Sequence, residues 1–259
     1  MTPVALTIAG SDPSGGAGLQ ADLKTFHQFG VYGEAVVTLV TVQNTQRVSR
    51  IELMPPDLVA EQIKAVLEDI PPRAAKTGAL GGAEIVLAVA ELARDFRFPL
   101  VVDPVMISKQ GARLLPVQAE EALKRRLLPY AALVTPNLPE AEALSGMEIR
   151  NEDDMSEAGD RILEFGCQAV LVKGGHLPGE PADILRWHGD RASYRGTRVP
   201  TRHTHGTGCT YSAAITASLA LGFTLPEAIF SSRQYVQRAI ETAPHLGNGA
   251  GPVNHFAAR

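Results

Sequence analysis

Short apolar runs alternate with amphipathic helical patterns through most of the 259 residues, and this alternation predicts an α/β fold. Three consecutive strand-and-helix units between residues 74 and 140 favour a mostly parallel sheet with helices on both faces. A hydrophobic content of 45% is enough to bury a sizeable core. No Ser/Pro-rich linker or charge block divides the chain, so we expect one domain over residues 1–259.

The expected elements follow from apolar spacing and from glycine and proline boundaries. Strands are expected at residues 4–8, 34–42, 74–77, 100–102, 131–134 and 169–172, with an edge hairpin formed by residues 183–188 and 192–198 around Gly189. Helices are expected after the first glycine-rich loop, over residues 57–69 and 83–94, from Met155 to Phe165, after Gly206 and over residues 225–242.

Charge and composition narrow the choice of partners. The net charge is −4 with a pI near 6.0, which carries no electrostatic footprint for nucleic acid or an anionic membrane. We therefore expect small-molecule ligands, no nucleic-acid partner and no membrane partner. The start of the chain lacks the basic residues of a signal peptide and no apolar run approaches the roughly 20 residues of a membrane span, so a cytoplasmic protein is expected.

The stretch from His203 to Ser212 is the first candidate for chemistry, because it places glycines, threonines and a cysteine at a loop-to-helix junction. A helix start leaves backbone NH groups without partners and carries partial positive charge, so Gly206, Thr207, Gly208 and Cys209 could enclose a phosphate. The helix dipole is also expected to lower the pKa of the Cys209 thiol. A glycine-capped turn with a buried cysteine is the equally weighted alternative.

Polar residues follow several expected strands. Lys76, Asp103, Asn137 and Glu140 come at or just after strand ends, and the carboxyl ends of parallel strands share one rim where ligands bind. A turn aspartate before proline and a first-turn helix glutamate are the simpler readings of Asp103 and Glu140 taken singly.

Gln43 ends the second strand, and its amide could form hydrogen bonds with a polar ligand ring. A hydrogen bond between this amide and the local backbone is at least as well supported by the sequence alone. Asp12 and Asp22 flank the first glycine-rich loop as ligands or, equally, as a turn residue and a solvated helix carboxylate. A transition-metal site on His203 and His205 is disfavoured because no third ligand has a useful spacing.

With these pieces placed, the chain strongly resembles the hydroxymethylpyrimidine/phosphomethylpyrimidine kinases of thiamine biosynthesis, within the ribokinase-like superfamily. The resemblance covers nearly the whole chain. It rests on collinear motifs at residues 6–18, 20–25, 43–45, 103–106, 135–141, 173–176 and 203–210.

The resemblance implies a three-layer α/β/α sandwich that uses ATP and Mg²⁺ to phosphorylate 4-amino-5-hydroxymethyl-2-methylpyrimidine, and then its monophosphate. It also implies a homodimer. By motif, the pyrimidine site is expected at Gly10, Asp22, Gln43 and Val105, the magnesium site at Asp103 and Glu140, and the nucleotide side at Asn137 and Lys173. A departure lies at Ala79, where some relatives have methionine, and this affects the hydrophobic wall of the pyrimidine pocket.

The expected mechanism places the transferred phosphate on the Gly206–Cys209 turn, with Cys209 accepting or orienting the proton of the substrate hydroxyl. Three alternatives stay open. A pyridoxal kinase would act on a similar small ring with a hydroxymethyl arm. A cysteine hydrolase would pair Cys209 with His205 or His203, without an evident third partner. A non-catalytic ligand-binding module would give no ADP release with either ring.

Overall fold

The computed structural model describes residues 2–259, and its centre is a nine-stranded sheet in the order β3-β2-β1-β4-β5-β6-β7-β8-β9. Five neighbouring strand pairs are parallel and three are antiparallel, the latter confined to the two ends of the sheet. The predicted mostly parallel sheet is therefore confirmed. No helix among residues 2–259 combines the length and the apolar character that crossing a bilayer requires.

Eight of the nine strands lie within three residues of the predicted ranges, and β3 at residues 48–53 was not predicted. The strands are β1 Val4–Ser11, β2 Tyr32–Gln43, β3 Val48–Leu53, β4 Ala74–Thr77, β5 Leu100–Val102, β6 Leu133–Val134, β7 Val170–Lys173, β8 Ala182–Trp187 and β9 Asp190–Arg195. The predicted hairpin around Gly189 is β8 and β9, and it forms one edge of the sheet as expected.

The helices are also close to their predicted ranges, except for short elements that carry little periodicity. They are α1 Gly18–Gln28, α2 Pro56–Asp69, α3 Ala83–Ala93, α4 Val117–Ala122, α5 Leu138–Ser145, α6 Glu152–Leu163, α7 Thr207–Ala220 and α8 Leu225–Glu241, with a π-helical turn at Leu123–Leu127 and a 3-10 turn at Leu128–Tyr130. The helix predicted from Met155 to Phe165 begins three residues earlier and ends before Phe165.

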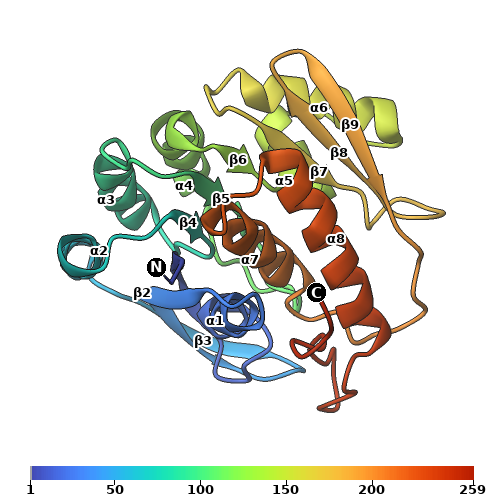
Figure 1. Cartoon of the computed structure of the whole chain (residues 1–259), viewed down its shortest axis with the longest axis horizontal. Coiled ribbons are helices and arrows are strands. Elements are labelled where there is room, and N and C mark those ends of the chain that lie inside the picture. Colours follow the sequence, from blue (N-terminus) through green and yellow to red (C-terminus); the bar gives the residue numbers. More distant parts are fainter. Residues whose placement is uncertain (1) are drawn as a thin grey trace.

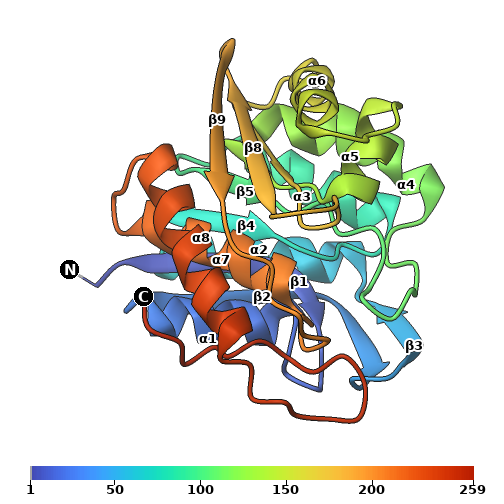
Figure 2. The ribbon, with the colours of Figure 1, turned by 90° about the vertical axis from the view of Figure 1, so that its right-hand side faces the viewer.

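Helices cover both faces of the sheet, which gives the expected three layers (Figures 1 and 2). Helices α2, α3, α5 and α6 bury their apolar sides against one face, while α1, α7 and α8 share a second core on the other. Neighbouring residues of one strand serve the two cores alternately: Leu100 and Val102 of β5 belong to the first core, and Val101 belongs to the second. Burial on both faces explains why the central strands read as continuous apolar runs.

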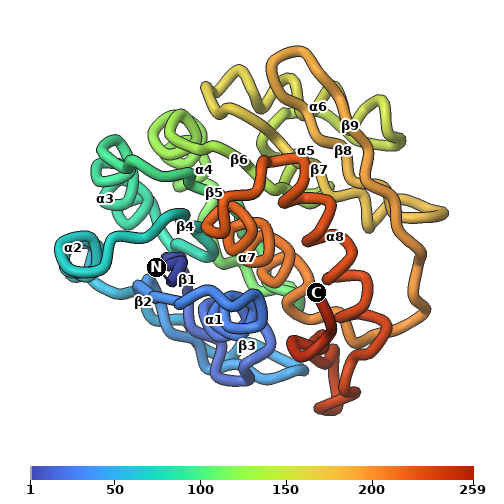
Figure 3. Tube along the Cα trace, in the orientation of Figure 1, coloured from blue at the N-terminus to red at the C-terminus, as the bar shows by residue number. Residues whose placement is uncertain are grey.

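The strand order reverses direction at β1, because the chain passes from β1 to β2 on one side and later returns to β4 on the other. In open α/β sheets, ligands bind outside the carboxyl ends of the strands at such a switch point. Because β1 and β4 pair in parallel, the loop after Ser11 and the turn after Thr77 leave the sheet at the same edge. Figure 3 follows the chain from β9 through residues 196–206 to the start of α7, which brings a third segment to the same place.

Glu34 on β2 carries a buried carboxylate oxygen with no hydrogen-bond partner among residues 2–259. Burial, with a smaller contribution from Asp69, raises the pKa of Glu34 to about 7. Because this pKa lies above the ordinary value of 4.5, the folded state binds the proton more tightly, and stability falls as pH rises from about 4.5 to about 7. We expect Glu34→Gln to raise Tm at pH 8 and to leave it unchanged near pH 4.5.

The measurement is thermal unfolding of both proteins at the two pH values. Glu61→Gln, at an exposed position of α2, is the matched control and should change Tm at neither pH. A Tm difference for Glu34→Gln that is the same at pH 4.5 and pH 8 would contradict the assignment.

Candidate active site

A cavity of about 840 Å³ opens at the carboxyl ends of the parallel strands, where the switch-point rule places a ligand. Segments 193 residues apart in the chain contact each other in this site, at Asp12 and His205. Every site residue predicted from the sequence lines the cavity. They are Gly10, Asp22, Gln43, Asp103, Val105, Asn137, Glu140, Lys173, Gly206, Thr207, Gly208 and Cys209.

The first glycine-rich loop is held in place by Asp12, whose carboxylate accepts hydrogen bonds from four groups. Oδ1 accepts from the Ser14 amide at 2.9 Å and the Ser14 hydroxyl at 2.7 Å, and Oδ2 accepts from the Ala17 amide at 2.9 Å and His205 Nε2 at 2.8 Å. Asp12 is therefore both a turn residue and the partner of a histidine that immediately precedes the Gly206 turn.

Asp22 on α1 forms a fully buried ion pair with Lys76 of β4, with 2.7 Å between Oδ1 and Nζ. Its other oxygen accepts a 2.6 Å hydrogen bond from Thr7 of β1. Burial alone would lower the pKa of Lys76, but the carboxylates of Asp22 and Asp103 outweigh it and keep the ammonium charged. The alternative of a solvated helix carboxylate at Asp22 is therefore wrong.

The strand end at Gln43 forms one wall of the cavity, together with Gly10 and Val105. Gly10 is required by close packing, since a Cβ there would lie 2.5 Å from Leu39 Cδ1 and 3.6 Å from Ala79 Cβ. Ala79, where the sequence departs from some relatives, lines the same wall. This side of the cavity thus combines one amide with small apolar side chains, as a flat polar ring requires.

The turn before α7 has the geometry of an anion site. Gly206 precedes the helix with φ at 79°, and no side chain among residues 2–259 caps the helix start. The Gly208 and Cys209 amides therefore stay available to a ligand. The Thr207 amide, predicted to take part as well, instead donates to Thr204 O at 3.3 Å. A Cβ at Gly206 would overlap the carbonyl oxygen of Gly16, so the two glycine-rich segments touch through their backbones.

A buried cluster around Asp103 faces this turn. Asp103 Oδ1 lies 3.1 Å from Lys173 Nζ and accepts from the Thr135 hydroxyl at 3.3 Å, while Oδ2 accepts from the Ser212 hydroxyl at 3.1 Å. Burial by itself would raise the pKa of Asp103, but the Lys173 and Lys76 ammonium groups outweigh it, so its pKa lies below the ordinary value. The result is a fixed negative charge beside a fixed positive one.

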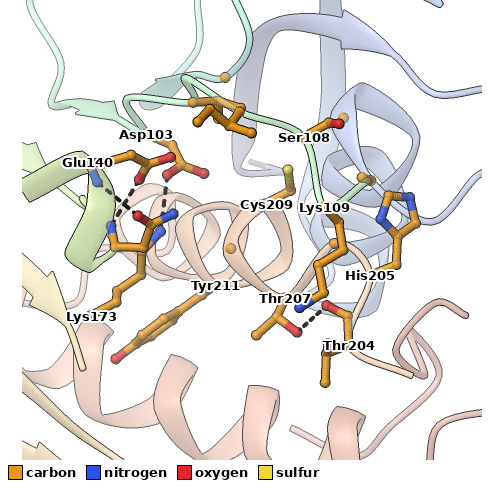
Figure 4. A pocket seen from close by; sticks show the side chains of 18 of the residues that line it. Asp103, Ser108, Lys109, Glu140, Lys173, Thr204, His205, Thr207, Cys209 and Tyr211 are labelled. Atoms are coloured by element: carbon orange, nitrogen blue, oxygen red, sulfur yellow. Dashed lines mark hydrogen bonds and ion pairs between the residues drawn. The ribbon is translucent and has the colours of Figure 1, made fainter. Parts of the chain in front are cut away.

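Gly208 shows how close this cluster comes to the helix start. A Cβ at Gly208 would lie 3.3 Å from Lys173 Nζ and 3.9 Å from Asp103 Oδ2. Figure 4 shows Asp103, Glu140 and Lys173 grouped on one side of the pocket, with Cys209 and Thr207 of α7 beside them. An anion bound by the α7 amides would therefore also contact the Lys173 ammonium.

Asn137 and Glu140 form a capping box at the start of α5. The Asn137 side chain accepts from the Glu140 amide at 3.0 Å, and Glu140 Oε2 accepts from the Asn137 amide at 2.9 Å. Burial raises the pKa of Glu140 to about 7, with Lys173 acting in the opposite direction. The simpler reading of Glu140 as a first-turn helix residue is thus correct, and the same carboxylate also lines the cavity.

Cys209 departs from the expectation for a helix-start thiol. Burial raises its pKa to about 12, although Lys76 opposes the shift, so the predicted lowering of the thiol pKa is wrong. The dipole of α7 is outweighed because the thiol is desolvated and lies near the carboxylates of Asp22 and Asp103. At neutral pH, Cys209 is a neutral thiol rather than a thiolate.

We expect no thiolate to appear below about pH 10 when the protein is titrated by ultraviolet thiolate absorbance, because burial raises the pKa of both Cys209 and Cys167 to about 12. Cys209→Ala separates the two thiols by difference. A thiolate signal near pH 8 that disappears in Cys209→Ala would overturn this prediction.

Magnesium was expected at Asp103 and Glu140, and the donor chemistry fits a cation that keeps most of its waters. No group of three or more His, Cys, Asp or Glu side chains suited to a metal occurs among residues 2–259. Mg²⁺ is commonly held by one or two carboxylates together with water and substrate phosphates. Asp103 and Glu140 both line the cavity next to the anion turn, which fits this pattern.

Several partners of the predicted site residues were not predicted. Thr7, Thr135 and Ser212 complete the hydrogen bonding of Asp22 and Asp103. Arg233 of α8 lies 3.0 Å from the buried Asp183 and lines the cavity. A signal for Arg233 was present in the sequence, because it occupies the buried face of α8 between Ile229 and Val236 at helical spacing.

The chain matches one protein family over most of its length. The phosphomethylpyrimidine kinase family model matches residues 12–254. The chain is 48% identical over 255 residues to the thiamine biosynthesis bifunctional protein ThiED of Geobacter sulfurreducens, covering 98% of this chain and 52% of that protein. It therefore spans about half the length of that relative. It is 46% identical over 260 residues to a hydroxymethylpyrimidine/phosphomethylpyrimidine kinase of Rhizobium meliloti, covering 99% of this chain and 98% of the relative.

Among solved structures, the pyridoxal kinase of Bacillus subtilis in complex with ADP superposes with a TM-score of 0.92 at 37% identity, covering 99% of this chain and 98% of that one. The whole chain, rather than one motif, thus shares the architecture of a small-molecule kinase. Sequence identity is higher to the pyrimidine kinase of Rhizobium meliloti, at 46%, than to this pyridoxal kinase, at 37%.

Proposed function

The chain belongs to the phosphomethylpyrimidine kinase family, and from that premise we propose that it transfers the γ-phosphate of ATP to 4-amino-5-hydroxymethyl-2-methylpyrimidine and then to the monophosphate. One observation carries the proposal: a single cavity has an amide-bearing ring wall at Gln43 and an anion turn flanked by Lys173 and Asp103. A hydroxymethyl ring and a nucleotide phosphate can both be held there.

Phosphoryl transfer asks a protein mainly for positioning and charge neutralisation. The amides of Gly208 and Cys209 and the Lys173 ammonium would bind the transferred phosphate. Asp103 and Glu140 would hold Mg²⁺, which when bound neutralises phosphate charge. Asn137 and Lys173 would face the nucleotide, while Gly10, Asp22, Gln43 and Val105 would surround the pyrimidine; all six line the cavity.

A protonated Cys209 is suited to orient the substrate hydroxyl and unsuited to accept its proton in the ground state. The single-turnover rate of Cys209→Ala decides between these roles. A general base typically contributes at least about 10²-fold, so a loss of less than about tenfold would exclude the role of base.

The test of the function is a coupled ADP-release assay with hydroxymethylpyrimidine, its monophosphate and pyridoxal measured side by side. We expect kcat/KM for hydroxymethylpyrimidine to exceed that for pyridoxal. The superposition on a pyridoxal kinase makes pyridoxal the second candidate substrate, and a higher kcat/KM for pyridoxal would reverse the assignment. No ADP release with any of the three substrates would favour a non-catalytic binding module. Hydrolysis of esters or amides would favour a cysteine hydrolase.

Three further expectations belong to the same proposal: a single domain over residues 1–259, a cytoplasmic location and a homodimer. The continuous nine-stranded sheet supports the first. Light scattering across working concentrations tests the homodimer, and a monomer mass throughout would refute it.

A further inference from the structure

His205 connects two parts of the cavity that the proposed mechanism uses separately. Its Nε2 lies 2.8 Å from Asp12 Oδ2 and 3.4 Å from the side-chain nitrogen of Gln43. The residue is 2% exposed, and the next residue, Gly206, begins the anion turn. Figure 4 shows the imidazole across the pocket from Asp103 and Lys173.

The proton between His205 and Asp12 can be placed by counting donors. Burial would raise the pKa of Asp12, but the hydrogen bonds from His205 and Ser14 outweigh it, so the pKa lies below its ordinary value and the group is a carboxylate. A carboxylate only accepts hydrogen bonds. The proton therefore belongs to His205, and Nε2–H is the donor.

A donating Nε2–H determines which atom of the Gln43 amide can face it. An amide NH₂ cannot accept a hydrogen bond, whereas the amide oxygen can. On the other side of the amide, Thr41 Oγ1 lies 3.2 Å from the second terminal atom of the Gln43 side chain. The Thr41 hydroxyl has one proton, and Ser11 O accepts it at 3.0 Å. Thr41 Oγ1 can then accept from Gln43 but cannot donate to it. His205 Nε2 has one proton, which points to Asp12 at 2.8 Å, so the 3.4 Å contact with Gln43 is the weaker branch of a three-centre hydrogen bond. With the amide nitrogen on that side two donors would face each other, so the network is free of a donor–donor contact only when Gln43 Oε1 faces His205 and Nε2 faces Thr41.

We propose that His205, held by Asp12, is a positioning residue that sets the orientation of the Gln43 amide and thereby the direction in which an aminopyrimidine ring enters the site. The inference rests on the proposed function. With Oε1 towards His205, the amide keeps one acceptor lone pair on the His205 side and one N–H on the Thr41 side for the substrate.

With its acceptor on the His205 side and its donor on the Thr41 side, the Gln43 amide can pair with the substrate edge in one direction only. An aminopyrimidine offers its 4-amino group as donor and the adjacent ring nitrogen as acceptor, so a fixed amide pairs with it in one register. The amino group then lies on the His205 side. The hydroxymethyl arm is attached to the carbon next to the amino-bearing carbon, so it points towards the Gly206 turn that follows His205. A reversed amide would pair with a reversed ring and turn the arm away.

The test compares substitutions that keep or remove the donor. His205→Met should lower kcat/KM for hydroxymethylpyrimidine about tenfold, mainly through KM, as expected for loss of one hydrogen-bond contact. His205→Gln, whose amide can donate to Asp12 and reach Gln43, should recover most of this loss. His205→Asn is too short to reach both partners and should behave like His205→Met, so the test survives if one variant does not fold.

Two controls separate positioning from a general structural effect. With 5-hydroxymethyl-2-methylpyrimidine, which lacks the amino group, His205→Met and the unaltered protein should have the same kcat/KM. In a Gln43→Met background, His205→Met should add less than about twofold. An equal loss with both substrates, or an undiminished loss in that background, overturns the inference. The absence of ADP release by the unaltered protein with hydroxymethylpyrimidine would instead refute the proposed function.

Discussion

Asp103→Asn should lower kcat by about 10²- to 10³-fold while leaving the protein folded. The substitution removes the negative charge of Asp103, whose Oδ1 lies 3.1 Å from Lys173 Nζ. The same charge would hold the metal. The fold should persist because an asparagine oxygen can still accept from Lys173 and Thr135. Its NH₂ can donate to Ser212 Oγ, whose own proton can go to the Gly208 or Cys209 carbonyl.

The measurement is kcat as a function of Mg²⁺ concentration, together with Tm. We expect the Mg²⁺ concentration that gives half-maximal rate to rise in Asp103→Asn. Ser212→Ala is the matched control, because it removes one hydrogen bond to Asp103 and keeps the charge. A rate for Asp103→Asn within tenfold of the unaltered protein, at the same Mg²⁺ requirement, would remove Asp103 from the site.

Gly206→Ala should destabilise the protein by about 3 kcal/mol, whereas Gly208→Ala should leave stability nearly unchanged. At Gly206 the backbone is left-handed, with φ at 79°, and the new Cβ would overlap the Gly16 carbonyl oxygen. For a chain of this size, the loss corresponds to a fall in Tm of about 6–12 °C. At Gly208 no left-handed φ occurs, and the new Cβ meets only the end of the flexible Lys173 side chain and, farther away, Asp103.

Gly208→Ala, which should keep its stability, is the variant in which we expect a specific loss of activity. We expect Gly208→Ala to fold normally, with its new methyl group between the α7 amides and Lys173, and we expect its kcat to fall about 10²-fold. Calorimetry and steady-state kinetics on both variants check the pair. A fully active Gly208→Ala would place the transferred phosphate elsewhere, and an unchanged Tm for Gly206→Ala would contradict the contact with Gly16.

The fold was predictable because the sheet is buried on both faces. Strand β5 is a run of three apolar residues, and β4 is fully buried although it contains Lys76 and Thr77. Each is followed by glycine or proline within two residues, and the observed bounds match the predicted ones. Helix α4 was not predicted, since six residues span less than two turns and show no periodicity.

The positions of the site residues followed from strand ends, but their pairings did not. Asp12 and His205 are 193 residues apart, and Asp22 and Lys76 are 54 apart, so no local spacing announces either contact. The thiol of Cys209 shows the same limit. A helix start favours a thiolate, yet the buried surroundings that prevent one include Asp22, Lys76 and Asp103 from three separate segments and are visible only in three dimensions.

The backbone hydrogen bonds of residues 250–253 bear on when the cavity can be completed during synthesis. Residues 250–253 pair with both walls of the cavity: Ala250 donates to Thr45 O at 3.0 Å, His205 donates to Gly251 O at 3.0 Å, and Val253 donates to His205 O at 3.3 Å. A nascent chain can assemble its sheet and most of its helices before these residues are synthesised. Before they are added, the Gln43 side and the Gly206 side lack the hydrogen bonds that join each of them to this segment, so the finished geometry of the cavity requires residues 250–253 to be in place.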